Sequence, residues 1–241
     1  MSSSKNSVTS WYSKALSDLK KLPGKGTLGE KVWVQRYLGS NKPTRCIKTG
    51  DIVKLGTELA KDVPPAELIN LVNNLYSQAT TFEEMHLAGV LLNQNPKLKT
   101  EVGLKKLNTW LNFTHGWAET DILCQNNWDT DIILANWPKW TKLLTKFAHH
   151  KNIHKRRASL VLLVTPVRKS SDQRLADTAF TNIELLKHEK EVLITKAVSW
   201  ILRALIINHR QKVSDYLAKN KDTLPKIAIR EVTNKLTTGK K

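Results

Sequence analysis

A Trp and an Asp in this chain are spaced so that they could assist bond cleavage in a cationic substrate. Trp117 and Asp121 stand four residues apart within the segment Thr114–Cys124, so both lie on one face of a predicted helix. A fixed carboxylate can stabilise a sugar that becomes an oxocarbenium ion, and it can hold the water that attacks that sugar. An indole face beside a positively charged nucleotide adds cation–π attraction of about 0.5 to 2 kcal/mol. The pair therefore suits cleavage between a sugar and a cationic leaving group.

A basic segment follows this pair. Between Lys139 and Ser171 the chain has nine Lys and Arg residues and no Asp or Glu. Because no carboxylate lies nearby in sequence, we expect these cations to lack local partners and to face phosphate groups. The residues alone do not decide between Arg156 and Arg157 as the main phosphate contact. The expected DNA-contacting residues of this segment are Lys151, His154, Lys155, Arg156 and Arg157.

A third segment repeats the combination of an aromatic ring with cations. Lys196, Trp200 and Arg203 are spaced by four and three residues, so they share one face of a predicted helix. In a curved helical array, this face could point into the same groove as the two preceding segments.

Structural roles for the same residues stay open. Trp200 lies in an apolar run and could be a packing residue, and Trp117 could belong to the core. Asp121 could cap a turn or pair with Arg157.

The charge of the whole chain points to a polyanionic partner. The 241 residues include 39 Lys+Arg against 21 Asp+Glu, a formal net charge of +18, with a pI near 9.9. Such a balance is typical of proteins that bind nucleic acid. Double-stranded DNA is the expected partner, bound mainly through phosphate contacts that weaken with salt.

Metal, disulfide and membrane roles have little support. Cys46 and Cys124 match no zinc-ligand spacing, and His150 and His154 have no third ligand nearby. We therefore expect no metal. No apolar run of about 18 residues and no secretory leader are recognisable. We expect a cytoplasmic protein, associated with the nucleoid if prokaryotic, and no membrane partner.

The elements that must position these residues are predicted to be helices throughout. Glycine (10) and proline (8) are scarce, and apolar residues after residue 50 recur at spacings of three and four. No hairpin turn signal separates alternating runs. The fold class expected is all-α: a HEAT-like helical-repeat solenoid of paired antiparallel helices with a concave basic groove, since pairs recur about every 35 to 40 residues. A globular helical bundle is the alternative.

We expect one domain over residues 1–241, with a looser N-terminal cap at 1–50 and a frayed tail at 237–241. Thr81 and Glu84 predict a capping box at the start of one helix. Further helices are predicted over residues 98–111, 116–126, 137–149, 153–166, 172–187, 190–208, 210–219 and 223–236.

The ordered motifs resemble those of the AlkD-type DNA alkylation repair enzymes, a family of HEAT-like DNA glycosylases. The resemblance covers most of the chain. Tyr37-Leu-Gly39 through Arg45 is similar to the family's N-terminal signature, and Glu84 with Ala88 is similar to its first repeats. More specific are the ordered motifs Trp-x-x-x-Asp, Arg-Ala and Lys-Ala-x-x-Trp-x-x-Arg, which begin at Trp117, Arg157 and Lys196.

The resemblance implies hydrolysis of the N-glycosidic bond of cationic alkylated purines, N7-alkylguanine or N3-alkyladenine, in duplex DNA. It implies Asp121 as the catalytic carboxylate, Trp117 and Trp200 as aromatic walls, and Arg157 as the phosphate clamp, with no enclosing base pocket. No cofactor is expected. The protein is expected to be a monomer. The chain departs from the family pattern in its glycine-rich N-terminal insert, in Ala118-Glu119, and in a longer gap from Arg157 to Trp200.

Three other interpretations remain. A non-catalytic HEAT-like protein that binds DNA or RNA is the main alternative, because one fold supports many roles. A scaffold for an acidic protein is a further possibility that the charge alone allows. Lys196 could form a Schiff base with the sugar and add strand cleavage, but no sequence feature indicates a depressed pKa for this lysine. We therefore predict a monofunctional enzyme.

Overall fold

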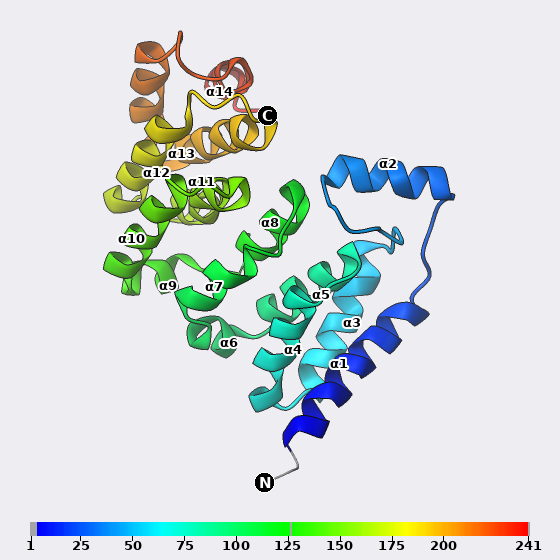
Figure 1. Cartoon of the computed structure of the whole chain (residues 1–241). Coiled ribbons are helices and arrows are strands. Elements are labelled where there is room, and N and C mark those ends of the chain that lie inside the picture. Colours follow the sequence, from blue (N-terminus) through cyan, green and yellow to red (C-terminus); the bar gives the residue numbers. More distant parts are fainter. Residues whose placement is uncertain (1–3, 126, 241) are drawn as a thin grey trace. The chain divides into compact units, whose positions relative to one another are not determined.

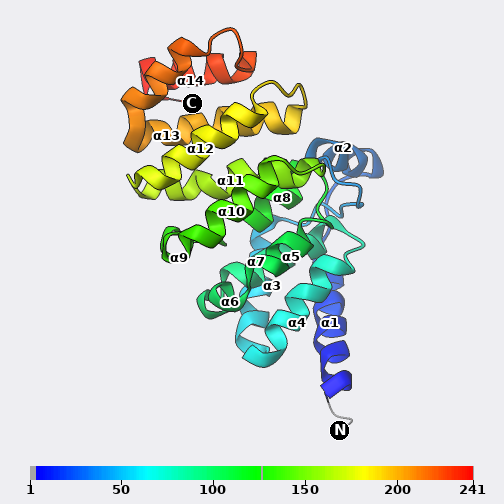
Figure 2. The ribbon, with the colours of Figure 1, turned by 60° about the vertical axis from the view of Figure 1, so that its left-hand side comes forward.

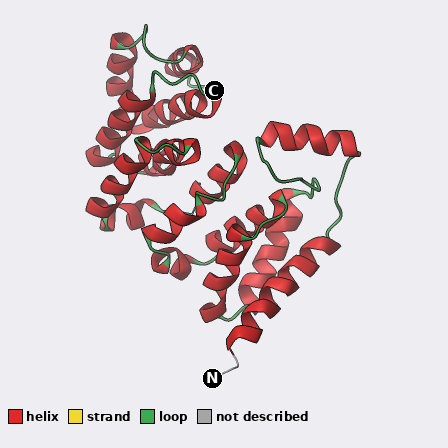
Figure 3. Ribbon diagram, in the orientation of Figure 1, coloured by secondary structure: helices red, strands yellow, loops and turns green. Residues whose placement is uncertain are grey.

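The computed structural model describes residues 4–125 and 127–240, and gives the backbone alone for residues 4–10. Within these residues it contains fourteen helices and no strand (Figures 1 and 3). The prediction of an all-α fold made of packed helix pairs is therefore confirmed. The chain divides into two compact units, residues 1–123 and 124–241. The boundary falls in the last turn of the helix Gly116–Cys124.

The first unit packs its helices around a core of aliphatic side chains. Helix α3 lies against α5, α4 lies against α5, and α1 lies against α4. Leu71, Val72 and Leu91 are at most 1% exposed there, and the ring of Tyr76 stacks on that of Trp110 at 4.9 Å. The helices of this unit are α1 (Ser4–Lys21), α2 (Leu28–Leu38), α3 (Thr49–Asp62), α4 (Pro65–Ser77), α5 (Phe82–Asn93), α6 (Pro96–Glu101), α7 (Leu104–Trp110) and α8 (Gly116–Cys124).

The second unit is organised around α11, which packs against α10, α12 and α13, while α13 packs against α14 (Figure 2). Eleven residues of α11 are buried, including the run Ala158–Val164. Asn152 and Asp172 cap α11 and α12 by accepting hydrogen bonds from the first-turn amides of His154 and Arg174. The helices are α9 (Thr130–Ala135), α10 (Trp137–Ala148), α11 (Ile153–Lys169), α12 (Gln173–Leu186), α13 (Val192–Lys219) and α14 (Lys226–Thr238).

Several helix boundaries differ from the sequence prediction. The single helix predicted over 98–111 is two short helices, α6 and α7, separated at Val102 and Gly103. Glycine has a low helix propensity, so a break at Gly103 loses little helix stability. Helix α9 was not predicted. The break predicted between the helices over 190–208 and 210–219 is confirmed, because the two parts of α13 meet at a kink where His209 has φ −134° and ψ 40°. Helix α11 continues past the predicted end at 166, through Pro166 to Lys169.

The capping box predicted at Thr81 is not formed. Thr81 is the N-cap of α5, but its side chain accepts no capping hydrogen bond. Glu84 instead accepts from the hydroxyls of Thr80 and Thr81, both at 2.9 Å, and from the Thr80 amide at 3.0 Å.

The predicted N-terminal cap, residues 1–50, contains two helices of different character. In α1, Ala15 and Leu19 belong to the core, and the Arg45 guanidinium caps the helix end by donating to the carbonyls of Leu19, Lys20 and Leu22 at 2.7 to 3.0 Å. In α2 no residue is buried. Of the predicted tail 237–241, residues 237 and 238 belong to α14, and residue 241 lies outside the described residues.

By length and composition, α13 could cross a membrane, contrary to the expectation that no segment qualifies. Its most apolar 18-residue window has a mean hydropathy of 1.3, and 56% of that window is buried in the protein. Because α13 packs against both α11 and α14, its apolar side chains have protein partners, as in a core helix.

Candidate nucleic-acid site

Helix α8 starts at a close contact between two glycines. Gly39 and Gly116 both have φ of +69°, a conformation that L side chains rarely adopt. A Cβ atom on Gly116 would lie 2.3 Å from the Leu38 carbonyl oxygen and 2.4 Å from the Gly39 carbonyl carbon. Glycine is therefore required for the end of α2 to approach the start of α8.

A buried carboxylate fastens the same two segments. Glu119 is 0% exposed and accepts hydrogen bonds from the Ser40 hydroxyl, from Lys42 Nζ at 3.0 Å and from the His115 amide at 2.9 Å. Lys42 Nζ also donates to the Phe113 carbonyl at 3.0 Å. The carboxylate thus has an ion-pair partner and additional donors, which a buried charge needs.

Trp117 and Asp121 lie on the outward face of α8, as the four-residue spacing predicted. Both are partly exposed, whereas Ala118, Glu119 and Thr120 between them are buried. Trp117 Nε1 donates to the Tyr37 carbonyl at 2.7 Å, and the two rings meet edge to face with centroids 5.5 Å apart. These contacts hold the indole against α2. Packing therefore orients Trp117 without removing it from solvent.

The start of α11 carries the predicted phosphate clamp. Arg157 is 4% exposed and its Nη1 donates to the Leu193 carbonyl at the start of α13. Arg156 forms a bidentate ion pair with Glu189 at 2.7 and 3.1 Å and donates to the carbonyls of His150 and Lys151. The expectation that Arg156 lacks an acidic partner is wrong, because Glu189 comes from the turn before α13 rather than from the carboxylate-free segment.

The neighbouring cations repel one another. Lys155 is 3% exposed, and burial followed by the charge of Lys146 lowers its pKa. The pKa of His150 is lowered by burial first and then by nearby lysines, with Lys155 the largest of these. Lys151 is exposed, and His154 is partly exposed. An anion near these groups would relieve the repulsion.

Helix α13 carries the predicted site residues Lys196, Trp200 and Arg203 on a face outside the core. Lys196 is exposed, and Trp200 and Arg203 are partly exposed, while the adjacent Val198, Ser199 and Ile201 are buried. Arg203 Nη2 pairs with Glu231 of α14 at 3.2 Å. Sequence reasoning missed this acidic partner because it lies 28 residues further along the chain.

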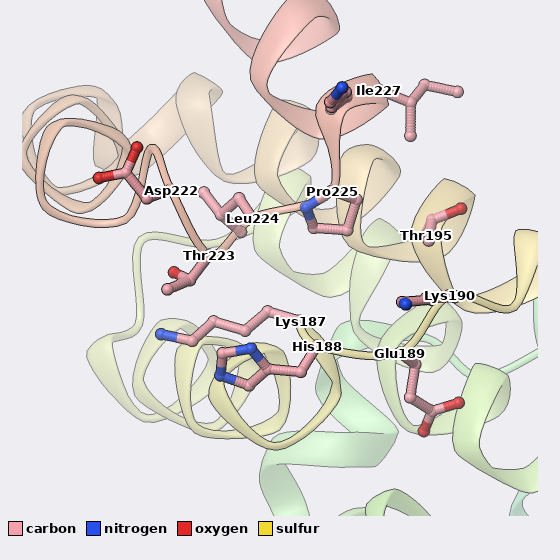
Figure 4. Close-up of a pocket in the computed structure, with 11 residues that line it drawn as sticks. Lys187, His188, Glu189, Lys190, Thr195, Asp222, Thr223, Leu224, Pro225 and Ile227 are labelled. Carbon is pink, nitrogen blue, oxygen red and sulfur yellow. The ribbon is translucent and has the colours of Figure 1, made fainter.

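A cationic cavity of about 530 Å³ opens between the end of α12 and the starts of α13 and α14 (Figure 4). Its charged lining consists of Lys187, Lys190, Lys226, Glu189 and Asp222. Lys187 donates to Asn220 at 2.7 Å and Glu189 pairs with Arg156. Sequence reasoning missed this cavity because its lining comes from two stretches far apart in the chain, residues 187–195 and 222–227. Lys187 also pairs with Glu184 at 2.7 Å, so the net positive charge of the lining is small.

The structure assigns the predicted site residues to two units. Trp117 and Asp121 belong to the first, whereas Arg157 and Trp200 belong to the second. Within the second unit, the Arg157 contact with Leu193 links the starts of α11 and α13. The convergence of all four side chains on one substrate stays a prediction. Within the described residues, no group of three or more His, Cys, Asp or Glu side chains could hold a metal ion.

Comparison with known proteins identifies the family. A family model described as DNA alkylation repair enzyme matches residues 19–236. A solved structure of a predicted DNA alkylation repair enzyme from Enterococcus faecalis superposes with a TM-score of 0.71 and 19% identity, over 90% of this chain and 100% of that chain. This likeness shows a shared fold. No curated protein sequence matches. Because the family model spans nearly the whole chain, the protein belongs to the DNA alkylation repair enzyme family.

Proposed function

We propose that the protein is an AlkD-type DNA glycosylase that hydrolyses the N-glycosidic bond of cationic alkylated purines, N7-alkylguanine or N3-alkyladenine, in duplex DNA. Membership of the DNA alkylation repair enzyme family makes DNA the substrate. The observation that carries the finer proposal is the outward Trp117–Asp121 face of α8, held in place by the buried Glu119.

The chemistry follows from the substrate's charge. Alkylation at N7 or N3 makes the purine a cation and a good leaving group, so the sugar gains positive charge as the bond breaks. The Asp121 carboxylate stabilises that charge and holds the attacking water. The exposed faces of Trp117 and Trp200 favour a cationic nucleotide over a neutral one. The enzyme needs no cofactor for this reaction, and it acts as a monomer in the cytoplasm.

Phosphate contacts come from the basic side chains of the second unit. We propose Arg157 as the main clamp, with further contacts from Lys151, His154 and Lys196, which are exposed or partly exposed. Arg156, Arg203 and Lys155 remain in the proposed set. The first two already pair with Glu189 and Glu231, so they contribute less net charge to phosphate binding than Lys196.

The decisive experiment measures base release from duplex DNA that carries one N7-methylguanine, under single-turnover conditions. The wild type releases the base, and Asp121→Asn slows release by about 100-fold or more while DNA affinity is kept. Asp131→Asn, which neutralises an exposed aspartate of α9, is the matched control and keeps full activity. Absence of release by a wild type that binds the duplex tightly would favour the non-catalytic binding protein. A borohydride-trapped covalent adduct would contradict the monofunctional mechanism.

A further inference from the structure

Helix α2 presents its apolar side chains to solvent. Leu28 is 80% exposed, Val32 40%, Trp33 65% and Tyr37 58%, and the helix contributes no buried residue. A helix in a globular protein normally buries an apolar stripe. A contiguous exposed apolar surface that includes two aromatic rings indicates a binding surface.

Two aromatic rings of α2 stack on each other in parallel planes. Trp33 and Tyr37 stack with centroids 5.6 Å apart and an angle of only 4° between their planes. The rings of Tyr37 and Trp117 also meet edge to face, with centroids 5.5 Å apart. The aromatic surface therefore runs from α2 to Trp117 of α8, which the proposed function places beside the substrate.

The orientation of this face is fixed at the C-terminal end of α2. The Tyr37 carbonyl accepts the Trp117 indole N–H, Gly39 lies against Gly116, and Ser40 donates to the buried Glu119. At the N-terminal end of the helix, Thr27 and Glu30 form a capping box. The rings are thus held at a set position relative to α8 although solvent surrounds them.

The charge around α2 identifies the kind of partner. From Lys20 to Lys48 the chain has eight Lys and Arg residues and one carboxylate, Glu30. Several of these cations have protein partners, such as Lys42 with Glu119 and Arg45 at the end of α1, but Lys31 and Arg36 lie on α2 itself. An aromatic face on a helix with these cations matches a polyanion that carries flat apolar rings, as in proteins that stack on the bases of nucleic acid. An acidic protein would match the charges but would leave the stacked rings without planar partners.

We propose that the Trp33–Tyr37 face binds a nucleobase displaced from the duplex beside the damaged site. In paired DNA each base face is covered by its neighbours, so a protein ring stacks on a base either by forcing two base pairs apart or by taking up a base that has left the helix. This inference rests on the proposed function, because it requires DNA in contact with the Trp117 face. It adds a contact that none of the predicted site residues supplies.

The test compares equilibrium binding to two duplexes of the same sequence at one salt concentration. One duplex is fully paired, and the other has an abasic-site analogue opposite an adenine, which leaves that base unpaired. Trp33→Ala is expected to weaken binding to the second duplex by about fivefold to 100-fold, and to the paired duplex less than twofold. Trp33→Phe restores most of the affinity, since it keeps a ring. Val53→Ala, at an exposed apolar position of α3 outside this surface, is the matched control and leaves both affinities unchanged.

Equal losses on both duplexes would contradict stacking on a displaced base, and no loss on either would overturn the role of the face. The proposed function fails separately. If the wild type shows the Trp33-dependent preference but releases no alkylated base, only the glycosylase assignment is lost. If base release occurs while Trp33→Ala binds like the wild type, only this inference is lost.

Discussion

At the scale of single residues, buried charge matters most for the site. Glu119 is fully buried, and its partner Lys42 has a side chain only 11% exposed. Pairing offsets the desolvation of both, but removal of either partner leaves an uncompensated charge in a medium of low dielectric constant. The ion pair therefore makes the contact between residues 39–42 and α8 sensitive to single substitutions.

Lys42→Met is expected to lower the free energy of unfolding by about 3 to 5 kcal/mol, because it leaves the Glu119 carboxylate buried without a cation. The double variant Lys42→Met/Glu119→Gln recovers most of this loss. Urea denaturation measures both values, and Lys54→Met, at an exposed position of α3, is the control. A double variant that is no more stable than Lys42→Met would argue against the ion pair as the cause.

Acidification is expected to destabilise the fold through its histidines. Burial is the main cause that lowers the pKa values of His86, His150 and His209 below the ordinary value of 6.5. A lowered folded-state pKa gives stability that is fully present above pH 6.5 and is lost as the pH falls through the folded pKa, since the unfolded chain takes up protons first. His86→Gln should reduce the loss of unfolding free energy between pH 7 and about pH 5.5. An unchanged pH dependence would exclude His86 as a contributor.

At the scale of elements, the position of α8 depends on backbone contact as well as on side chains. The helix is nine residues long, so its own hydrogen bonds provide little stability. Its start is fixed by the Gly39–Gly116 approach and by the Glu119 hydrogen bonds. The position of the Trp117–Asp121 face therefore depends on the contacts between residues 39–42 and the start of α8.

Gly116→Ala tests the junction directly. Its positive φ costs about 1 to 3 kcal/mol for an alanine, and the new Cβ would overlap the Leu38 carbonyl, so both stability and base release should fall. Gly50→Ala is the matched control, because Gly50 is in helix α3 and a Cβ atom added there would have no atom within 4 Å. That change should raise the free energy of unfolding by about 0.4 to 1 kcal/mol. A Gly116→Ala protein with normal stability and normal base release would show that the close contact is dispensable.

At the scale of the whole molecule, net charge dominates the expected interaction with DNA. The +18 charge arises from cations in both units, although several of them, such as Arg156 and Arg203, have acidic partners. Only unpaired cations release counterions from DNA when they bind phosphate. The salt dependence of binding therefore counts the phosphate contacts rather than the total of Lys and Arg residues.

DNA affinity should fall linearly on a plot of log K against log salt concentration. Lys196→Gln, at an exposed position of α13, is expected to reduce the slope by about one unit, because it removes about one phosphate contact. Lys14→Gln is the control, since Lys14 already pairs with Asp18 at 2.8 Å, and it leaves the slope unchanged. Identical slopes for the wild type and Lys196→Gln would remove Lys196 from the DNA interface.

The sequence alone determined the all-helical class, the placement of Trp117 with Asp121 on one face, and the strong positive charge. These depend on local periodicity and on composition, which need no knowledge of distant contacts. It could not place the break at Gly103 or predict α9, because short helices depend on packing.

Only the tertiary structure decided which charges are paired and which rings are exposed. Glu119 meets Ser40 and Lys42, which precede it by 79 and 77 residues, and Arg156 meets Glu189, 33 residues further along the chain. The exposed Trp33–Tyr37 face likewise follows from how little of α2 the other described residues cover. Contacts between residues far apart in sequence form only when the chain folds, so no local pattern specifies them.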